Sequence, residues 1–273
     1  MQYGVVLPGG TAPQLLELAI AAEKAGWDGV FVWEAAYGVD AWTLLGAIAT
    51  NTSRIRLGTM LTPLPWRRPW KVASQVVTLD QISDGRAILA VGLGAVATGL
   101  GQNGEVLDVQ ERAAMLDEGI ALLRNFWRGD LTFFGEHYKA DLRSRPDLAE
   151  AGTPVQDDIP IWVVGAWPRE RSLGRALRCS GVIPEPMLGD LTPETVRELR
   201  AWCSARGATD AFDIVVEGET RCDPQAAATA VAPWSEAGAT WWMETQWAQP
   251  RTAPRMLARF RARIEAGPPR PGA

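Results

Sequence analysis

The segment from Ile55 to Gly94 constrains the fold more than any other part of the chain. It begins with an apolar strand, Ile55–Met60, which a loop rich in Pro, Trp and Arg connects to a helical pattern over residues 69–82. A second apolar strand, Ala87–Val91, then runs into Gly92-Leu93-Gly94. A strand–helix–strand unit of this kind requires a parallel sheet covered by helices. Ligands bind such sheets where strands end and helices begin, so the residues after these strands are candidates for a site.

The same alternation continues through most of the chain. Eight strands, each followed by a helix and with no break in composition, predict a single (β/α)8 TIM-barrel domain over residues 1–266. The alternative is an open doubly wound sheet, which favours Gly-x-Gly-x-x-Gly after the first strand, where the chain reads Leu7-Pro8-Gly9-Gly10. The apolar runs that predict strands are residues 3–7, 29–33, 55–60, 87–91, 160–164, 181–184, 212–217 and 240–244.

Two segments fall outside this repeat. Residues 128–158 are polar, contain proline and lack a regular period, so we expect an excursion from the barrel that carries at most a short hairpin. Residues 267–273 are rich in proline and glycine, and we expect a disordered tail there.

Composition excludes several classes of partner. With 47% apolar and 22% charged residues the chain is typical of a soluble globular protein with a sizeable core. A net charge of −5 gives no broad positive field, which argues against nucleic acid or an anionic membrane as a partner. No stretch approaches the roughly 18 apolar residues that span a bilayer, and the N-terminal residues enter a strand directly. We therefore expect a cytoplasmic protein that binds a small-molecule substrate.

Cysteine and histidine are too few for several kinds of site. The three cysteines, Cys179, Cys203 and Cys222, are widely spaced, which leaves neither a disulfide framework nor a Cys-x-x-Cys metal site. His137 is the one histidine, so a site with several histidine ligands is impossible, and we predict no metal. His137 falls in the polar excursion, where we expect a surface residue.

Thirteen tryptophans are far more than average usage gives. Most tryptophans pack in cores or interfaces, because indole buries a large area. Several here follow predicted strands, and an aromatic rim at the strand ends would suit a flat, conjugated ligand. On this basis Trp33, Trp66 and Trp241 are candidate substrate contacts.

An ordered set of short motifs resembles the bacterial luciferase-like flavin-dependent monooxygenases. The set runs in family order over nearly the whole chain, and it comprises Gly26-Trp27-Asp28-Gly29, Ile55-Arg56-Leu57-Gly58-Thr59, Arg68-Pro69, Ser83-x-Gly85-Arg86, Val91-Gly92-x-Gly94, Ile159-Pro160-Ile161-Trp162 and Gly238-Ala239-Thr240-Trp241-Trp242. The resemblance implies a luciferase-like (β/α)8 barrel that binds FMN or the deazaflavin coenzyme F420 at its C-terminal mouth, commonly as a homodimer.

The function implied by the resemblance is a flavin- or deazaflavin-dependent oxidoreductase. One form is a monooxygenase that acts on a small apolar organic substrate, with reduced flavin delivered by a separate flavin reductase. The alternatives are a deazaflavin-dependent hydride-transfer reductase or dehydrogenase, a non-catalytic flavin-binding protein, and a barrel that binds phosphate-bearing sugars. The sequence does not decide between FMN and F420.

The resemblance also assigns cofactor-binding residues. The end of the third strand, with Thr59, Met60 and Thr62, would run beside the ring system, and Gly92 and Gly94 would let the backbone approach it. The phosphate would be held after the fifth strand and at the start of the next helix, where free N–H groups favour an anion, by Gly165, Ala166, Trp167 and Ser172.

Five acidic residues at or just after predicted strand ends are the candidates for proton transfer: Glu34, Asp40, Glu185, Glu217 and Glu244. Many family members carry a histidine after the second strand, where this chain reads Glu34-Ala35-Ala36. A histidine role therefore cannot be carried over to this chain. Glu34, which directly follows the second strand beside Trp33, and Asp40 are the predicted catalytic residues, and Arg67, Glu185 and Glu244 join the candidate substrate contacts. The structural alternative for each carboxylate is a helix cap or an arginine partner, and Asp40 can cap the helix that follows it.

Overall fold

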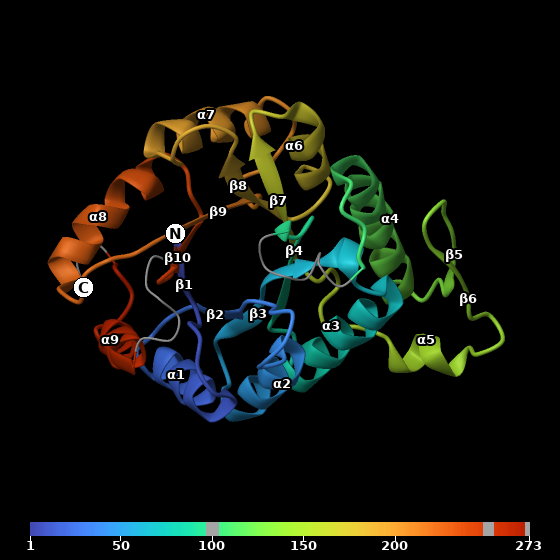
Figure 1. Ribbon diagram of the computed structural model, residues 1–273, viewed down its shortest axis with the longest axis horizontal. Coiled ribbons are helices and arrows are strands. Elements are labelled where there is room, and N and C mark those ends of the chain that lie inside the picture. The colour runs from blue at the N-terminus through green and yellow to red at the C-terminus, as the bar shows by residue number, and fades with distance from the viewer. Residues whose placement is uncertain (97–103, 248–253, 271–273) are drawn as a thin grey trace.

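Parallel strands close into a barrel with helices packed around its outside (Figure 1). The computed structural model describes residues 1–96, 104–247 and 254–270. Within these residues, the strand order around the barrel is β1-β10-β9-β8-β7-β4-β3-β2, which confirms the predicted (β/α)8 fold. The barrel strands are β1 (Gln2–Val6), β2 (Gly29–Val32), β3 (Arg56–Pro63), β4 (Ala87–Gly92), β7 (Ile161–Trp167), β8 (Gly181–Pro186), β9 (Asp213–Gly218) and β10 (Trp241–Glu244).

Several of the described helices begin at a residue whose side chain accepts a free backbone N–H group. Asp40, Asp108 and Asp223 each accept a hydrogen bond from an N–H in the first turn of the helix that follows. The helices are α1 (Ala12–Lys24), α2 (Ala41–Asn51), α3 (Pro69–Ser83), α4 (Val109–Trp127), α5 (Asp147–Ala151), α6 (Glu170–Ala176), α7 (Pro193–Ser204), α8 (Pro224–Glu236) and α9 (Pro254–Glu265), and a 3₁₀ turn, η1, covers Leu64–Trp66. None of the described helices is long and apolar enough to cross a membrane.

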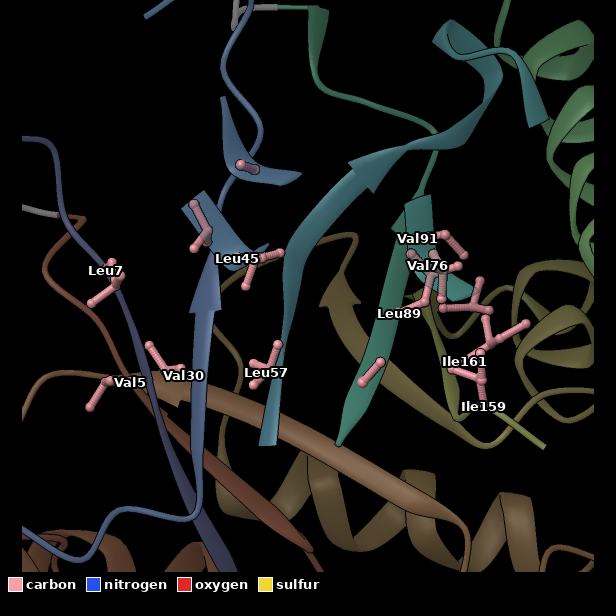
Figure 2. Close-up of a cluster of buried hydrophobic side chains, with 14 of the residues drawn as sticks. Val5, Leu7, Val30, Leu45, Leu57, Val76, Leu89, Val91, Ile159 and Ile161 are labelled. Carbon is pink, nitrogen blue, oxygen red and sulfur yellow. The ribbon is translucent and has the colours of Figure 1, made fainter. Parts of the chain in front are cut away.

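Alternate residues of each strand serve two separate cores, because successive side chains of a strand point to opposite faces. The larger core lies between the barrel and its helices, and Figure 2 shows part of it, with strand residues such as Leu57 and Leu89 beside Leu45 of α2 and Val76 of α3. The smaller core fills the barrel interior with ten buried apolar residues. These residues are Val6, Phe31, Met60, Ile88, Ala90, Trp162, Ile183, Val215, Trp241 and Met243.

Three aromatic rings form a layer inside the barrel. The ring centroid of Trp162 lies 5.3 Å from that of Phe31 and 5.2 Å from that of Trp241, within the range of favourable aromatic pairs. Trp241 opens β10 and pairs in register with Gln2, the first residue of β1. The layer therefore closes the barrel from the N-terminal end of the strands and leaves space at the C-terminal end.

The predicted excursion leaves the barrel after α4 and lies to one side of it (Figure 1). It contains an antiparallel hairpin, β5 (Thr132–Phe134) and β6 (Lys139–Asp141), and also the short helix α5, which was not predicted. The Glu118 carboxylate of α4 accepts the backbone N–H groups of Glu136, His137 and Tyr138, at 2.8 to 3.1 Å, and so ties the hairpin turn to the barrel.

The chain after α9 differs from the sequence expectation. Residues 267–270, the first part of the predicted disordered tail, are ordered against the N-terminal end of the barrel, and residues 271–273 lie outside the described residues. The Arg270 guanidinium donates to both carboxylate oxygens of Asp28, at 2.7 and 2.8 Å, and lies over the Tyr3 ring. A charged residue with a carboxylate partner fixes a segment whose composition alone predicts disorder.

Candidate active site

A cavity of about 540 Å³ opens at the C-terminal ends of the barrel strands, where the fold predicts a ligand site. Its volume falls within the usual range of small-molecule sites. The walls are mostly apolar, with carboxylates from several strand ends. The residues that line it are Trp33, Glu34, Met60, Leu61, Pro63, Gly92, Leu93, Gly94, Ala95, Val164, Ala166, Ser172, Ile183, Glu185, Glu217 and Trp247.

The Glu34 carboxylate is held in place from three sides. Its Oε1 accepts hydrogen bonds from the Trp42 indole and, at 2.9 Å, from the Thr62 hydroxyl. Its Oε2 accepts from Arg67 Nη1 at 2.5 Å. Burial raises the pKa of the Glu34 carboxyl, and this effect outweighs the lowering by Arg67, Thr62 and Trp42. Glu34 is therefore a fixed carboxyl at the cavity wall, with a proton affinity above that of an exposed glutamate.

The third strand is irregular where it reaches the cavity. Its pairing register with β4 shifts between Thr59 and Thr62, and the peptide bond from Met60 to Leu61 is cis. Met60 and Leu61 line the cavity, whereas Thr59 and Thr62 are fully buried and hydrogen-bonded to each other at 2.9 Å. The resemblance placed all of Thr59, Met60 and Thr62 beside a cofactor. The structure brings Met60 to the cavity and places the two threonines behind it.

The fourth strand ends in a turn that buried groups hold from behind. Arg112 of α4 donates to the Leu93 and Gly94 carbonyl oxygens at 3.1 and 2.8 Å, and its guanidinium lies 5.2 Å from the Trp66 ring centre. Gly94 has φ +82°, and a Cβ there would lie 2.4 Å from the Trp66 ring. Trp66 itself donates to the Val106 carbonyl. Gly92 and Gly94 thus line the cavity, while Trp66 supports the turn and is not among the lining residues.

The end of β7 and the start of α6 together contribute two of the four residues predicted there. Ala166 and Ser172 line the cavity, and the Ala166 N–H donates to the Ser172 hydroxyl oxygen at 3.0 Å. Gly165 faces the other way, since a Cβ there would lie 2.6 Å from Val182 and 2.9 Å from Leu173. Trp167 packs against the outer core. Gly165 and Trp167 therefore lie outside the cavity wall, because alternate residues of β7 point toward the helices.

Two further carboxylates, Glu185 of β8 and Glu217 of β9, enter the cavity from neighbouring strands. Glu217 Oε2 accepts a hydrogen bond from the Trp247 indole at 2.5 Å. Desolvation by the surrounding protein raises the pKa of the Glu217 carboxyl, with the Trp247 hydrogen bond opposing the effect and the Glu185 charge adding to it.

Four other predicted residues have structural partners away from the cavity wall. Asp40 caps α2 by accepting from the Thr43 N–H at 2.7 Å, which is the structural alternative named for it. Arg67 supports Glu34 from behind and also donates to Gln75.

The two predicted residues of β10 also lie away from the cavity. Trp241 lies in the aromatic layer at the N-terminal end of its strand. Glu244 points outward, where it accepts from Thr220 and pairs with Arg263.

Sequence reasoning missed several residues of the site. Val164 and Ile183 follow from strand periodicity, because each stands two residues after a buried interior position of its strand. Trp42 sits in the first turn of α2, and nothing in its spacing from Glu34 signals their hydrogen bond.

One group of side chains among the described residues could supply metal ligands: Glu118, Glu136 and His137 in the excursion. Both oxygens of the Glu118 carboxylate already accept backbone hydrogen bonds of the hairpin turn. The Glu118 carboxylate therefore has a structural role in the hairpin turn.

With the fold and the cavity described, comparison with known proteins identifies the family. The model of the luciferase-like monooxygenase family matches residues 1–269, and the chain belongs to this family. Among curated relatives, an F420-dependent glucose-6-phosphate dehydrogenase of Mycolicibacterium fortuitum is 32% identical over 77% of this chain and 65% of its own length. The enzyme of the same name from Mycobacterium avium is 36% identical over 52% of this chain and 46% of its own length.

The chain spans roughly half to two thirds of the length of these relatives. A solved structure of an F420-dependent secondary alcohol dehydrogenase, in complex with an F420–acetone adduct, superposes with a TM-score of 0.75. It covers 99% of both chains at 19% sequence identity, so the likeness shows the barrel fold.

Proposed function

We propose that this protein is an F420-dependent oxidoreductase that transfers a hydride between the deazaflavin and a small organic substrate. The observation that carries the proposal is that residues assigned to cofactor binding on three strands, one loop and one helix meet around one cavity. These residues are Met60, Gly92, Gly94, Ala166 and Ser172. The F420-dependent names of the curated relatives favour the deazaflavin over FMN.

The cavity wall fits a planar ring system. A Cβ at Gly92 would lie 3.2 Å from both Leu61 and Val164, which line the cavity themselves, so glycine keeps this wall flat. We assign the ring to the apolar wall of Met60, Leu61 and Gly92. The phosphate belongs near Ser172, whose hydroxyl accepts from Ala166 and donates no hydrogen bond within the described residues.

When bound, F420 supplies a ring carbon that accepts or returns a hydride, and the protein has to position the substrate and manage a proton. Glu34 suits the second task. Its carboxyl reaches the cavity, its orientation is fixed by Trp42, Thr62 and Arg67, and burial raises its pKa. We propose that a Glu34 oxygen accepts the proton that leaves a substrate N–H or O–H group during oxidation.

Titration of the purified protein with F420 and with FMN tests the cofactor. We expect F420 to bind the more tightly, and substrate-dependent loss of its oxidised absorbance band to follow. Binding of FMN in preference, with turnover that consumes oxygen, would replace this proposal by the monooxygenase. Failure to bind either coenzyme would reject both.

The variant E34Q tests the proton acceptor. We expect turnover to fall about a hundredfold or more, the usual contribution of a general base, while F420 affinity is unchanged. D40N is the matched control, because Asp40 is also an acid after β2 but caps a helix away from the cavity. Equal turnover in E34Q and the unaltered protein would remove Glu34 from the mechanism.

Assembly and location are part of the same proposal. We propose that residues 1–266 fold as one domain, and that the protein is a cytoplasmic homodimer. The family match over residues 1–269 and the three free cysteines support the domain and the reducing compartment. A separate flavin reductase is proposed only with FMN, because F420 chemistry by hydride transfer between substrates needs none. Sedimentation equilibrium measures the oligomeric state.

A further inference from the structure

Arg112 is a buried cation whose position is unfavourable on electrostatic grounds. It is 6% exposed and lies four residues after Asp108, the cap of α4, where the partial positive charge of a helix N-terminus disfavours a cation. Within the described residues it forms no ion pair with an aspartate or glutamate. Residues 97–103 and 248–253 contain neither amino acid. Because burial of an unpaired charge is costly, the presence of Arg112 here needs another explanation.

The Arg112 guanidinium binds the turn that follows β4, Leu93-Gly94-Ala95. Its Nη1 donates to the carbonyl oxygens of Leu93 and Gly94, at 3.1 and 2.8 Å. Its Nε is buried and meets no acceptor among the described residues, so these contacts do not satisfy the whole guanidinium. All three residues of the turn line the cavity, whereas Arg112 does not. The arginine therefore holds one wall of the cavity from behind.

Trp66 supports the same turn from a second element, η1. The Arg112 guanidinium lies 5.2 Å from the centre of the Trp66 ring, and the indole N–H donates to the Val106 carbonyl at 2.8 Å, just before α4. Gly94 packs against this ring, since a Cβ there would lie 2.4 Å from it, and its φ of +82° also favours glycine. A cation from α4 and a ring from η1 thus fix the conformation of the turn.

A turn that is fixed before binding favours tight binding of a coenzyme. Ordering a mobile backbone segment costs conformational entropy, and a segment that already has its bound shape avoids most of that cost. Gly92 and Gly94, which we assign to the coenzyme, stand directly before the turn and within it. Loss of order in the turn would therefore weaken coenzyme binding, although no residue that lines the cavity is changed.

We propose that Arg112, packed on Trp66, is a positioning residue that preorganises the turn after β4 for the coenzyme. The inference rests on the proposed function, because the ligand that the turn serves is F420. It also gives Trp66 a role behind the cavity wall, in place of the substrate contact that its sequence position suggested.

Arg86 supplies a matched control at the opposite end of the same strand, directly before Ala87. It is also buried, at 8% exposure, and it donates to four backbone carbonyl oxygens. Like Arg112, it has no ion pair with a carboxylate of the described residues. R86Q and R112Q each remove the charge of a buried arginine that binds the backbone, but R86Q acts far from the cavity.

Two measurements on the full chain test the proposal. Titration with F420 should show R112Q binding at least about tenfold more weakly than the unaltered protein, a difference of about 1.4 kcal/mol, and R112K binding within about threefold of it. R86Q should lower the midpoint of urea unfolding and leave F420 affinity unchanged. In the protein without coenzyme, the NMR order parameters of the Leu93, Gly94 and Ala95 amides should fall from about 0.85 toward 0.6 in R112Q and not in R86Q.

Unchanged F420 affinity in R112Q would overturn the proposal, as would an equal loss in R86Q or a turn that stays rigid in R112Q. Equal weakening in R112K would also overturn it, because lysine keeps both the charge and the N–H donors. If R112Q does not fold, W66F takes its place, since it removes the hydrogen bond to Val106 and leaves Arg112 intact. Weaker F420 binding in W66F supports the proposal, and unchanged binding overturns it.

The proposed function can fail separately from this inference. Absence of F420 binding by the unaltered protein rejects the proposed function. The order parameters are measured without coenzyme, so they still decide whether Arg112 fixes the turn. Normal F420 binding in both the unaltered protein and R112Q rejects the role of Arg112 and leaves the proposed function in place.

Discussion

At the scale of single residues, a carboxylate placed after a parallel strand can serve three purposes, and this chain uses all of them. Asp40 caps a helix, Glu244 pairs with a buried arginine, and Glu217 faces a cavity. Glu34 combines two of these, since it pairs with Arg67 and reaches the cavity wall. All four lie at or just after a strand end in the sequence, and what separates them in the structure is the side-chain direction and the partner that it meets.

Asp40 allows a direct separation of the capping and catalytic roles. D40A should lower the free energy of unfolding by about 1 kcal/mol, because the Thr43 N–H loses its acceptor. D40S should restore most of that loss, since serine also caps, and both variants should turn over at the normal rate. Urea unfolding and steady-state kinetics measure the two effects. A loss of turnover in D40S would show that the carboxylate itself takes part in the reaction.

We expect the protein to become more stable when the charge of Glu217 is removed, by an amount that depends on pH. The pKa of Glu217 is raised in the folded state, so the folded protein disfavours its ionised form. Its unfavourable contribution is absent below the unfolded-state pKa and fully present above the folded-state pKa. E217Q should therefore be more stable than the unaltered protein at pH 8, and this advantage should shrink as pH falls toward 4. Thermal unfolding from pH 4 to 8 measures it, and a pH-independent difference would contradict the assignment.

At the scale of elements, the alternation along each strand decides which predicted residues reach the cavity. On β7, Trp162, Val164 and Ala166 face the interior, whereas Gly165 faces Val182 and Leu173. The strands and helices were predictable to within a few residues, because apolar runs and helical periods are local. The family resemblance and the position of acidic residues both mark strand ends and not strand faces. The resemblance therefore selected Gly165 along with Ala166, and the strand-end position selected Glu244 along with Glu185.

A methyl group added to a strand glycine distinguishes a position that points toward the helices from one that points toward the cavity. G165A places a Cβ 2.6 Å from Val182 in the outer core, so it should lower the free energy of unfolding by about 1–3 kcal/mol and leave F420 affinity unchanged. G92A directs its Cβ toward Leu61 and Val164 at the cavity wall, so it should weaken F420 binding. Unfolding curves and cofactor titrations on both variants test the assignment. Weaker F420 binding in G165A would return Gly165 to the cofactor site.

At the scale of the whole molecule, the local pattern predicts a barrel but not the contacts that close it. The first and last strands, β1 and β10, pair directly, and α9 packs beside α1 at the seam (Figure 1). These contacts join residues far apart in the sequence, and their polar partners, such as Glu244 with Arg263, have no local signal. The same limit applies to the cavity, where Trp42 and Glu34 meet only in the folded chain.

Substitution of the Glu244–Arg263 pair tests how the first and last parts of the chain are held together where the barrel closes. Both side chains are almost fully buried, at 1% and 2% exposure, and Glu244 also accepts the N–H and hydroxyl of Thr220, so it joins β10, α9 and the loop after β9. E244Q leaves the Arg263 charge buried without its partner and should lower the free energy of unfolding by about 3–5 kcal/mol. E17Q is the matched control, because Glu17 pairs with Arg261 of the same helix at the surface, where the loss should stay below about 1 kcal/mol. Guanidinium unfolding compares the two. Equal losses would show that α9 closes the barrel through its apolar face, with no special part for the buried pair.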